Sequence, residues 1–247
     1  MTIASIVGKF AMDLGDTPPE RDSWFLDYVL RSPRQAGIHL TAGWLCLQEL
    51  HAEMGPDAFL TCREYFGGMG AQALMVEHLF APALRDHYVQ EYSDEAVAHL
   101  QTVKPGRLIV SKADAYDPRS SAPADLVMLD FGDLTAWKTR EGEPHHDLLE
   151  RVFLMEPKAV VFTDIAARYL HLHRERYEGL LGANTCGSYE TYLDALLRRI
   201  QRLFGYSLLV GYHDRWSTVM ALVPSGEWHP LPQLHPTPTE PPGLELF

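Results

Sequence analysis

A glycine-rich run that begins with an acid is the segment best suited to hold a reactive ligand, Glu64-Tyr-Phe-Gly-Gly-Met-Gly70. Glycine lets the backbone turn tightly and lets a ligand approach without meeting a Cβ atom. An apolar stretch precedes the run and a helical pattern follows it, so the glycines fall where a strand turns into a helix. The segment therefore predicts a cofactor loop, although many ordinary tight turns also contain Gly-Gly.

Two classes of cofactor fit such a loop. Gly68-x-Gly70-x-x-Ala73 meets the dinucleotide fingerprint, which favours NAD. Glu64, however, stands before the glycines, where a carboxylate would repel the pyrophosphate of NAD. The same carboxylate can accept a hydrogen bond from the amino group of S-adenosylmethionine (SAM), whose positive sulfonium lies nearby. Glu64 therefore favours SAM over NAD.

Further acids stand at the ends of later predicted strands. Glu91, followed by Tyr92, comes 91 − 70 = 21 residues after the last glycine, the distance at which a carboxylate takes both ribose hydroxyls. Asp114, followed by Ala115, is placed to meet the amino group of adenine. Asp130 ends the next predicted strand, at the sheet edge where open α/β folds bind ligands. Taken singly, each acid is more often a loop residue or a helix cap.

Strands and helices alternate along the chain, which predicts an α/β fold with a mostly parallel sheet and helices on both faces. The last two predicted strands are joined by so short a turn that they must be antiparallel. The predicted strands are 58–66, 87–91, 107–111, 126–130, 159–164, 206–213 and 217–223. The predicted helices are 23–30, 36–54, 71–79, 94–100, 147–154 and 189–204.

Composition bounds the possible functions. A net charge of −12 disfavours broad binding to phosphates, with Arg198, Arg199 and Arg202 as one local basic candidate. The three cysteines have no metal-like spacing and indicate reduced thiols, so we expect a cytoplasmic protein and no metal site. No apolar run is long enough to span a bilayer.

We expect three regions: an N-terminal arm and helical cap (1–57), a cofactor-binding α/β domain (58–224) and a proline-rich tail (225–247).

Over residues 58–223 the chain resembles the class I SAM-dependent methyltransferases. The run from Glu64 to Gly70 resembles their first motif, with Phe66 where many members have another glycine, a variant similar to DNA methyltransferases. The resemblance implies a Rossmann-like methyltransferase fold with a seven-stranded sheet and an antiparallel C-terminal hairpin. It also implies SAM as cofactor. The implied cofactor-binding residues are Glu64, Phe66, Gly67, Gly68, Gly70, Glu91, Tyr92, Asp114 and Ala115.

The catalytic region departs from the known subfamilies. The segment Asp130-Phe-Gly-Asp133 lacks the two prolines of amino-group DNA methyltransferases and the Pro-Cys of cytosine-ring enzymes. Asp130 remains the best-placed acid and is our candidate catalytic residue, with His145 and His146 as weaker candidate bases. The acceptor is left open between a nucleic-acid base and a small molecule. Two other functions stay open: a degenerate SAM-fold binding module and, less favoured, an NAD-binding oxidoreductase.

Overall fold

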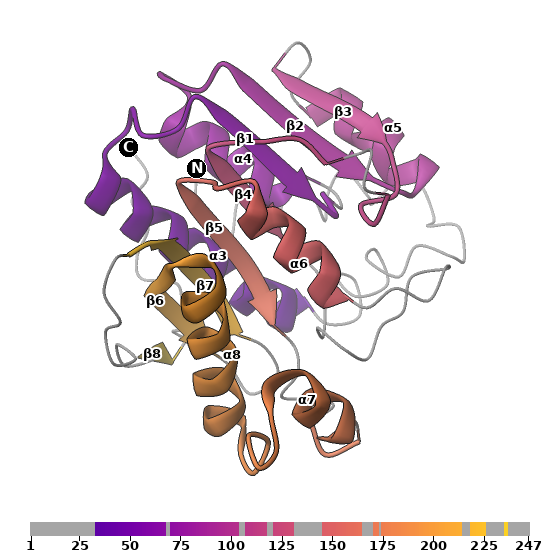
Figure 1. The fold of residues 1–247 in the computed structure, drawn as a ribbon. Coiled ribbons are helices and arrows are strands. Elements are labelled where there is room, and N and C mark those ends of the chain that lie inside the picture. The colour runs from indigo at the N-terminus through magenta and orange to yellow at the C-terminus, as the bar shows by residue number, and fades with distance from the viewer. Residues whose placement is uncertain are drawn as a thin grey trace.

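The computed structural model contains one mixed sheet between two layers of helices (Figure 1). The structure describes residues 33–67, 70–103, 107–117, 121–130, 145–164, 170–172, 174–213, 218–225 and 235–236. The predicted α/β class is confirmed. The predicted helix 23–30, Gly68 and the loop 131–144 lie outside the described residues.

The central strands run parallel and the C-terminal hairpin runs antiparallel, as predicted. The strand order is β3-β2-β1-β4-β5-β7-β6-β8. The strands are β1 (Thr61–Tyr65), β2 (Asp86–Glu91), β3 (Leu108–Lys112), β4 (Leu126–Leu129), β5 (Ala159–Asp164), β6 (Tyr206–His213), β7 (Thr218–Pro224) and β8 (His235–Pro236). Because β1 to β4 are parallel neighbours, their carboxyl ends meet at one edge of the sheet.

Helices cover both faces of the sheet. The helices α3 (Pro33–Met54), α4 (Ala71–Phe80) and α5 (Asp94–Val103) cover one face, and α6 (His145–Leu154) and α8 (Tyr189–Phe204) cover the other. The helix α7 (Arg174–Leu181) packs against α8. The first face buries Trp44 and Leu47 of α3 against strand residues such as Met128. The helix α3 thus packs directly on the sheet, and Cys46 Sγ donates to the Val219 carbonyl at 3.5 Å. The three-region division of the chain stays a prediction.

Local signals explain why α8 matches its predicted range. A reciprocal capping box between Ser188 and Thr191 begins the helix, and Gly205 ends it in the left-handed region at φ 74°. Its buried residues recur at helical spacing: Tyr192, Leu193, Leu196, Leu197 and Ile200. A helix with strong caps and one apolar face is the kind that sequence patterns locate best.

In the part of the chain that the structure describes, the sheet has eight strands where the sequence predicts seven. The additional strand β8 lies in the proline-rich tail and pairs in parallel with β6, Tyr212 opposite His235. A two-residue strand leaves no alternation of apolar and polar residues in the sequence. The helix α7 was also absent from the predicted elements, because it is short and buries only Tyr177.

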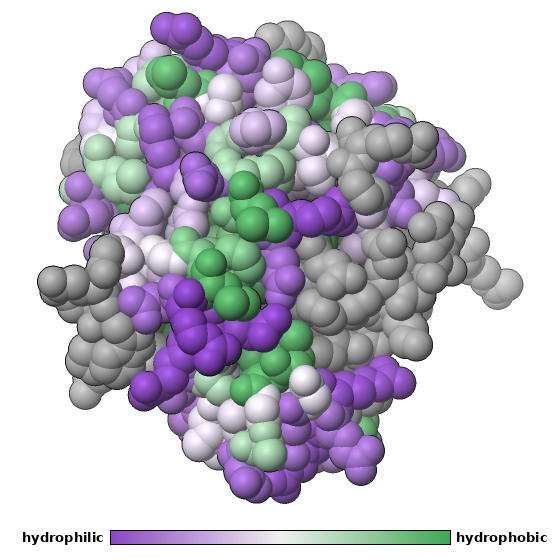
Figure 2. Space-filling view, in the orientation of Figure 1, coloured by the Kyte–Doolittle hydropathy of each residue, from purple (hydrophilic) through white to green (hydrophobic). Residues whose placement is uncertain are grey.

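Apolar residues on the face shown in Figure 2 form small groups bordered by hydrophilic ones. The large apolar residues that are exposed in the described part of the chain come from separate elements: Leu60, Tyr92, Ile109, Leu154, Leu172 and Leu203. In the described ranges, no helix has the length and apolar character that crossing a membrane requires.

Close packing explains one glycine of the predicted loop. Gly67 follows β1, and its N–H donates to the Gln90 carbonyl at 3.0 Å. A Cβ atom at Gly67 would lie 2.2 Å from Val89 Cγ1, well inside van der Waals contact. Gly67 therefore lets the chain lie against β2, whatever ligand the loop holds.

We expect Gly67→Ala to lower the free energy of unfolding by about 1–3 kcal/mol, the usual effect of overpacking. Urea unfolding measures it. Gly43→Ala is the matched control, because nothing lies within 4 Å of a Cβ there and the site is inside α3; it should stabilise by about 0.5–1 kcal/mol. In a Val89→Ala background, Gly67→Ala should lower the free energy of unfolding by less, and a Gly67→Ala protein as stable as wild type would refute the packing argument.

Candidate functional site

A pocket of about 160 Å³ lies at the carboxyl edge of the sheet, over β1, β2 and β3. Each strand contributes the residues at or just beyond its end, because parallel strands release their chains on the same side. The lining residues are Phe66, Gln90, Glu91, Tyr92, Ala113, Asp114, Ala115 and Tyr116. The structure thus brings Phe66, Glu91, Tyr92, Asp114 and Ala115 together, while their binding roles stay predictions.

Backbone N–H groups hold both carboxylates of this pocket in place. Glu91 Oε1 accepts hydrogen bonds from the N–H of Tyr92 at 2.6 Å and of Ser93 at 3.1 Å. Asp114 Oδ1 accepts one from the N–H of Tyr116 at 2.9 Å. These hydrogen bonds fix the direction in which each carboxylate points. Both acids are therefore set to receive hydroxyl or amino donors from a ligand.

The loop between β1 and α4 is shaped by two residues with positive φ. Gly70, at φ 81°, is the N-cap of α4, and its N–H donates to the Gly67 carbonyl at 2.9 Å. Phe66 has φ 60°, which is unusual for a residue with a Cβ atom, and its ring lies 5.7 Å from that of Tyr116. The backbone at Phe66 is one that glycine adopts freely, which accounts for the glycine that the resembling family often has there.

Glu64 lies behind the pocket and is only 1% exposed. Burial raises the pKa of its carboxyl well above 4.5, and the charges of Asp130 and Glu91 raise it further. His87 of β2 faces it, with 3.8 Å between His87 Nε2 and Glu64 Oε2. Burial and the two neighbouring acids therefore favour the neutral form of the Glu64 carboxyl, and a nearby cation would favour the charged form.

Asp130 follows β4 at the same edge and is half-buried. The Gln72 amide Nε2 on α4 donates to Asp130 Oδ2 at 3.3 Å. The loop after Asp130 lies outside the described residues, as do the side chains of His145 and His146. Asp130 thus follows the strand that pairs with β1, close enough for its charge to raise the pKa of Glu64.

A second cluster, not predicted from the sequence, lies on this edge around Asp164 at the end of β5. Asp164 is fully buried and accepts from the hydroxyls of Tyr192 at 2.7 Å and Tyr189 at 3.3 Å. Tyr189 also donates to Thr218 Oγ1 at 2.8 Å. The signal that singled out Asp130, an acid closing a predicted strand, was present at Asp164 as well.

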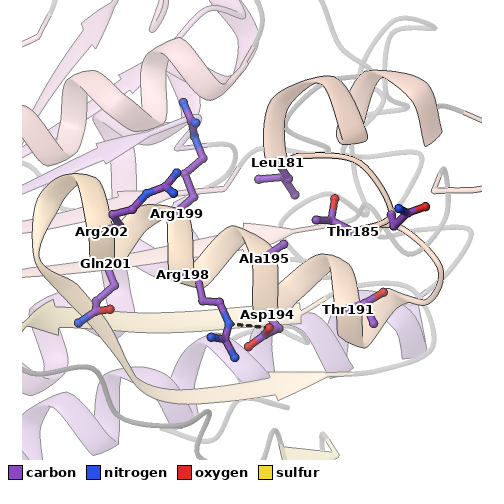
Figure 3. Close-up of a pocket in the computed structure, with 10 residues that line it drawn as sticks. Leu181, Thr185, Thr191, Asp194, Ala195, Arg198, Arg199, Gln201 and Arg202 are labelled. Carbon is purple, nitrogen blue, oxygen red and sulfur yellow. Dashed lines mark hydrogen bonds and ion pairs between the residues drawn. The ribbon is translucent and has the colours of Figure 1, made fainter.

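A larger pocket of about 590 Å³ lies elsewhere, along α8 and the segment after α7 (Figure 3). It includes the basic candidates Arg198, Arg199 and Arg202. Arg198 pairs with Asp194 at 2.7 Å, the dashed line of Figure 3, and Arg199 pairs with Glu150 at 2.7 Å. Two of these charges are therefore compensated in place, and the residues that line this pocket come from helices and a loop, not from strand ends.

Comparison with known proteins supports the fold. No protein-family model matches the chain, and no curated protein does. Among solved structures, the plantazolicin methyltransferase BpumL in complex with SAH superposes with a TM-score of 0.56 at 12% identity, covering 90% of this chain and 97% of that one. Magnesium protoporphyrin IX methyltransferase (ChlM) from Synechocystis PCC 6803 gives 0.50 at 16% identity, with the same coverages.

The chain has the class I SAM-dependent methyltransferase fold. This confirms the predicted Rossmann-like architecture and its antiparallel C-terminal hairpin, in which β7 lies between β5 and β6. Within the methyltransferase fold, the pocket of Glu91 and Asp114 occupies the carboxyl edge of the first three strands.

The burial of Glu64 predicts a pH-dependent stability. Its pKa is raised in the folded chain, so the folded state holds a proton that the unfolded state loses above about pH 4.5. The free energy of unfolding therefore falls as pH rises. Glutamine does not titrate, so the Glu64→Gln protein should not lose stability in this way. Its free energy of unfolding minus that of wild type should therefore rise by roughly 1 kcal/mol or more from pH 5 to pH 8.

Urea unfolding at both pH values measures the difference. The control is Glu53→Gln, an exposed carboxyl near the end of α3, which should change little with pH. If the stability difference between Glu64→Gln and wild type is the same at pH 5 and pH 8, the Glu64 carboxyl is ionised throughout and the argument fails.

Proposed function

We propose that this chain is a SAM-dependent methyltransferase. One observation carries the proposal: in a methyltransferase fold, the ends of adjacent strands bring Glu91 and Asp114 into one pocket with both carboxylates held by backbone N–H groups. Carboxylates so held match the hydroxyl and amino donors of an adenosine group. The presence of SAH in the BpumL and ChlM structures supports the same cofactor.

The residues divide the proposed cofactor between them. Glu91 takes the ribose hydroxyls, with Tyr92 beside it, and Asp114 and Ala115 take the adenine. Phe66 covers the pocket wall where β1 ends. Glu64, behind the loop of Gly67, Gly68 and Gly70, takes the amino group of the methionine part.

Methyl transfer from SAM is a displacement on an electrophilic methyl group, which SAM supplies through its sulfonium. The chain must then align an acceptor atom with that methyl and remove a proton where the acceptor carries one. Asp130 is the proposed base, because it follows β4 at the carboxyl edge of the sheet and Gln72 orients its carboxylate. Its place next to the cofactor loop is what an acceptor-contacting acid requires.

The net charge of −12 favours a small molecule over a nucleic-acid base as acceptor. The names of two neighbours point the same way, since one is a plantazolicin and the other a magnesium protoporphyrin IX methyltransferase. The alternative is a binding module that holds SAM without transferring its methyl group. It is favoured by one observation, the absence of the known catalytic motifs in Asp130-Phe-Gly-Asp133.

Glu91→Ala tests the cofactor site. A hydrogen bond involving a charged group contributes about 1.5–3 kcal/mol, so we expect SAH affinity to fall roughly 10- to 150-fold. Isothermal titration calorimetry with SAH, SAM and NAD measures it, and wild type should bind the first two but not NAD. Glu95→Gln, an exposed acid on α5, is the control and should bind normally. An unchanged dissociation constant for Glu91→Ala, or equal binding of NAD by wild type, would overturn the assignment.

Asp130→Asn tests the enzyme reading, because it removes charge and basicity while keeping size. We expect SAH affinity to stay within a few-fold and methyl transfer to fall by about 100-fold, the scale of a lost general base. The assay follows labelled methyl from SAM into a metabolite extract, with DNA and RNA as further arms. Full activity in Asp130→Asn would exclude the base, and tight SAH binding without any transfer by wild type would favour the binding module.

A further inference from the structure

The guanidinium of Arg151 reaches from α6 to the connection between β3 and β4, part of which lines the pocket of Glu91 and Asp114. Arg151 Nη2 donates to the Tyr116 carbonyl at 3.0 Å, and Arg151 Nη1 donates to Ser121 Oγ at 3.2 Å. Because the guanidinium is a rigid planar group, two bonds from it fix direction as well as distance. Arg151 therefore attaches this connection to α6 at two points.

Tyr116 carries this attachment into the pocket. Its N–H is the donor that holds Asp114 Oδ1, and its carbonyl is the acceptor that Arg151 binds. The N–H of Asp117 donates to the Asp114 carbonyl at 3.1 Å, which closes a tight turn around Tyr116. Arg151 and the Asp114 carboxylate are thus bonded to opposite ends of one residue. A displacement of Tyr116 would therefore turn the carboxylate.

Packing brings the same helix and the same turn together. Ala115 is 5% exposed and belongs to the buried cluster that contains Leu148 and Val152 of α6. The ring of Tyr116 also contacts that of Phe66, so the turn forms a pocket wall together with the end of β1. The apolar contacts hold the turn near α6, and the bonds from Arg151 add the direction that apolar contacts do not supply.

We propose that Arg151 is a positioning residue that aims the Asp114 carboxylate at the amino group of the cofactor's adenine. The proposal rests on the proposed function, in which Asp114 takes the adenine. None of the described residues that line the pocket belongs to α6, so Arg151 acts through Tyr116 and not on the cofactor itself. The helix α6 would thus control which base the site accepts.

The chemistry of the two partners makes base preference the quantity that depends on Arg151. A carboxylate accepts hydrogen bonds but cannot donate them, so it pairs with the amino group of adenine. Hypoxanthine carries an oxygen in place of that amino group, and the two acceptors cannot bond. A site built to bond an amino group therefore rejects the analogue that lacks it, provided that the carboxylate is held in place.

Arg151→Gln removes the two-point contact and keeps a polar side chain. The probes are SAH and S-inosylhomocysteine, its analogue with hypoxanthine, and calorimetry measures both affinities. We expect wild type to prefer SAH roughly 10- to 150-fold, the value of a hydrogen bond with a charged group. Arg151→Gln should lower SAH affinity about tenfold and bring the preference down by a similar factor. A merely structural role would weaken both ligands equally and leave the preference unchanged.

Arg199→Gln is the matched control. Arg199 is also a half-buried arginine, but it pairs with Glu150 at 2.7 Å and is not among the described residues that line the cofactor pocket. Its variant should keep the wild-type affinity and preference. Arg151→Lys, the second variant, keeps the charge without the planar fork and should fall between wild type and Arg151→Gln.

A double-mutant cycle tests whether Arg151 acts through Asp114. In an Asp114→Ala background, Arg151→Gln should cause no further loss of base preference, because the carboxylate that it aims is gone. A folded Arg151→Gln protein with the affinity and the base preference of wild type would overturn the proposal.

Hydrogen exchange in the free protein separates this proposal from the proposed function. The amides of residues 113–117 should exchange about tenfold faster in Arg151→Gln and at the wild-type rate in Arg199→Gln, because only the first variant releases the turn. Unchanged exchange in Arg151→Gln would overturn the assignment of Arg151 even if wild type binds SAH. Failure of wild type to bind SAH would overturn the proposed function and the adenine role with it, while faster exchange would still establish that Arg151 holds the turn.

Discussion

The main constraint on this structure is that several acidic side chains lie at one edge of its sheet. Parallel strands end on the same side, and four of them end in or next to an acid, so Glu64, Glu91, Asp130 and Asp164 face that side together. Asp114 joins them after β3. Carboxylates this close repel one another, and burial weakens the screening by water. Each acid therefore needs its own compensating group, and these groups differ from one acid to the next.

The compensation differs along the edge. Glu91 and Asp114 accept hydrogen bonds from backbone N–H groups and line the pocket. Asp164 receives two tyrosine hydroxyls and is fully buried, so it ties β5 to α8. Glu64 is the least compensated, with an unpaired buried oxygen in the described residues. Interiors rarely leave a carboxylate so placed, and a positively charged ligand group is the natural remaining partner.

Periodicity and strand ends predicted most of this arrangement, because alternation of elements fixes a parallel sheet and so the edge where its acids meet. Glu91 and Asp114 fell into one pocket for that reason. The roles of Gln72 and Arg151 could not be predicted, since their partners lie far away in the chain and meet them only through packing. The strand β8 was missed because it is set by its pairing with β6, not by its own residues.

Glycine patterns alone do not distinguish the two cofactor classes, and the structure gives the reason. Gly70 is needed to begin α4 at positive φ, and Gly67 is needed to clear Val89, so both serve the strand-turn-helix unit itself. Any cofactor loop built on that unit has similar needs, which is why the dinucleotide fingerprint also fits. Discrimination has to come from charge. A pyrophosphate placed among Glu64, Glu91 and Asp130 would add negative charge to an edge where acidic groups already repel one another. A sulfonium and an ammonium would reduce that repulsion.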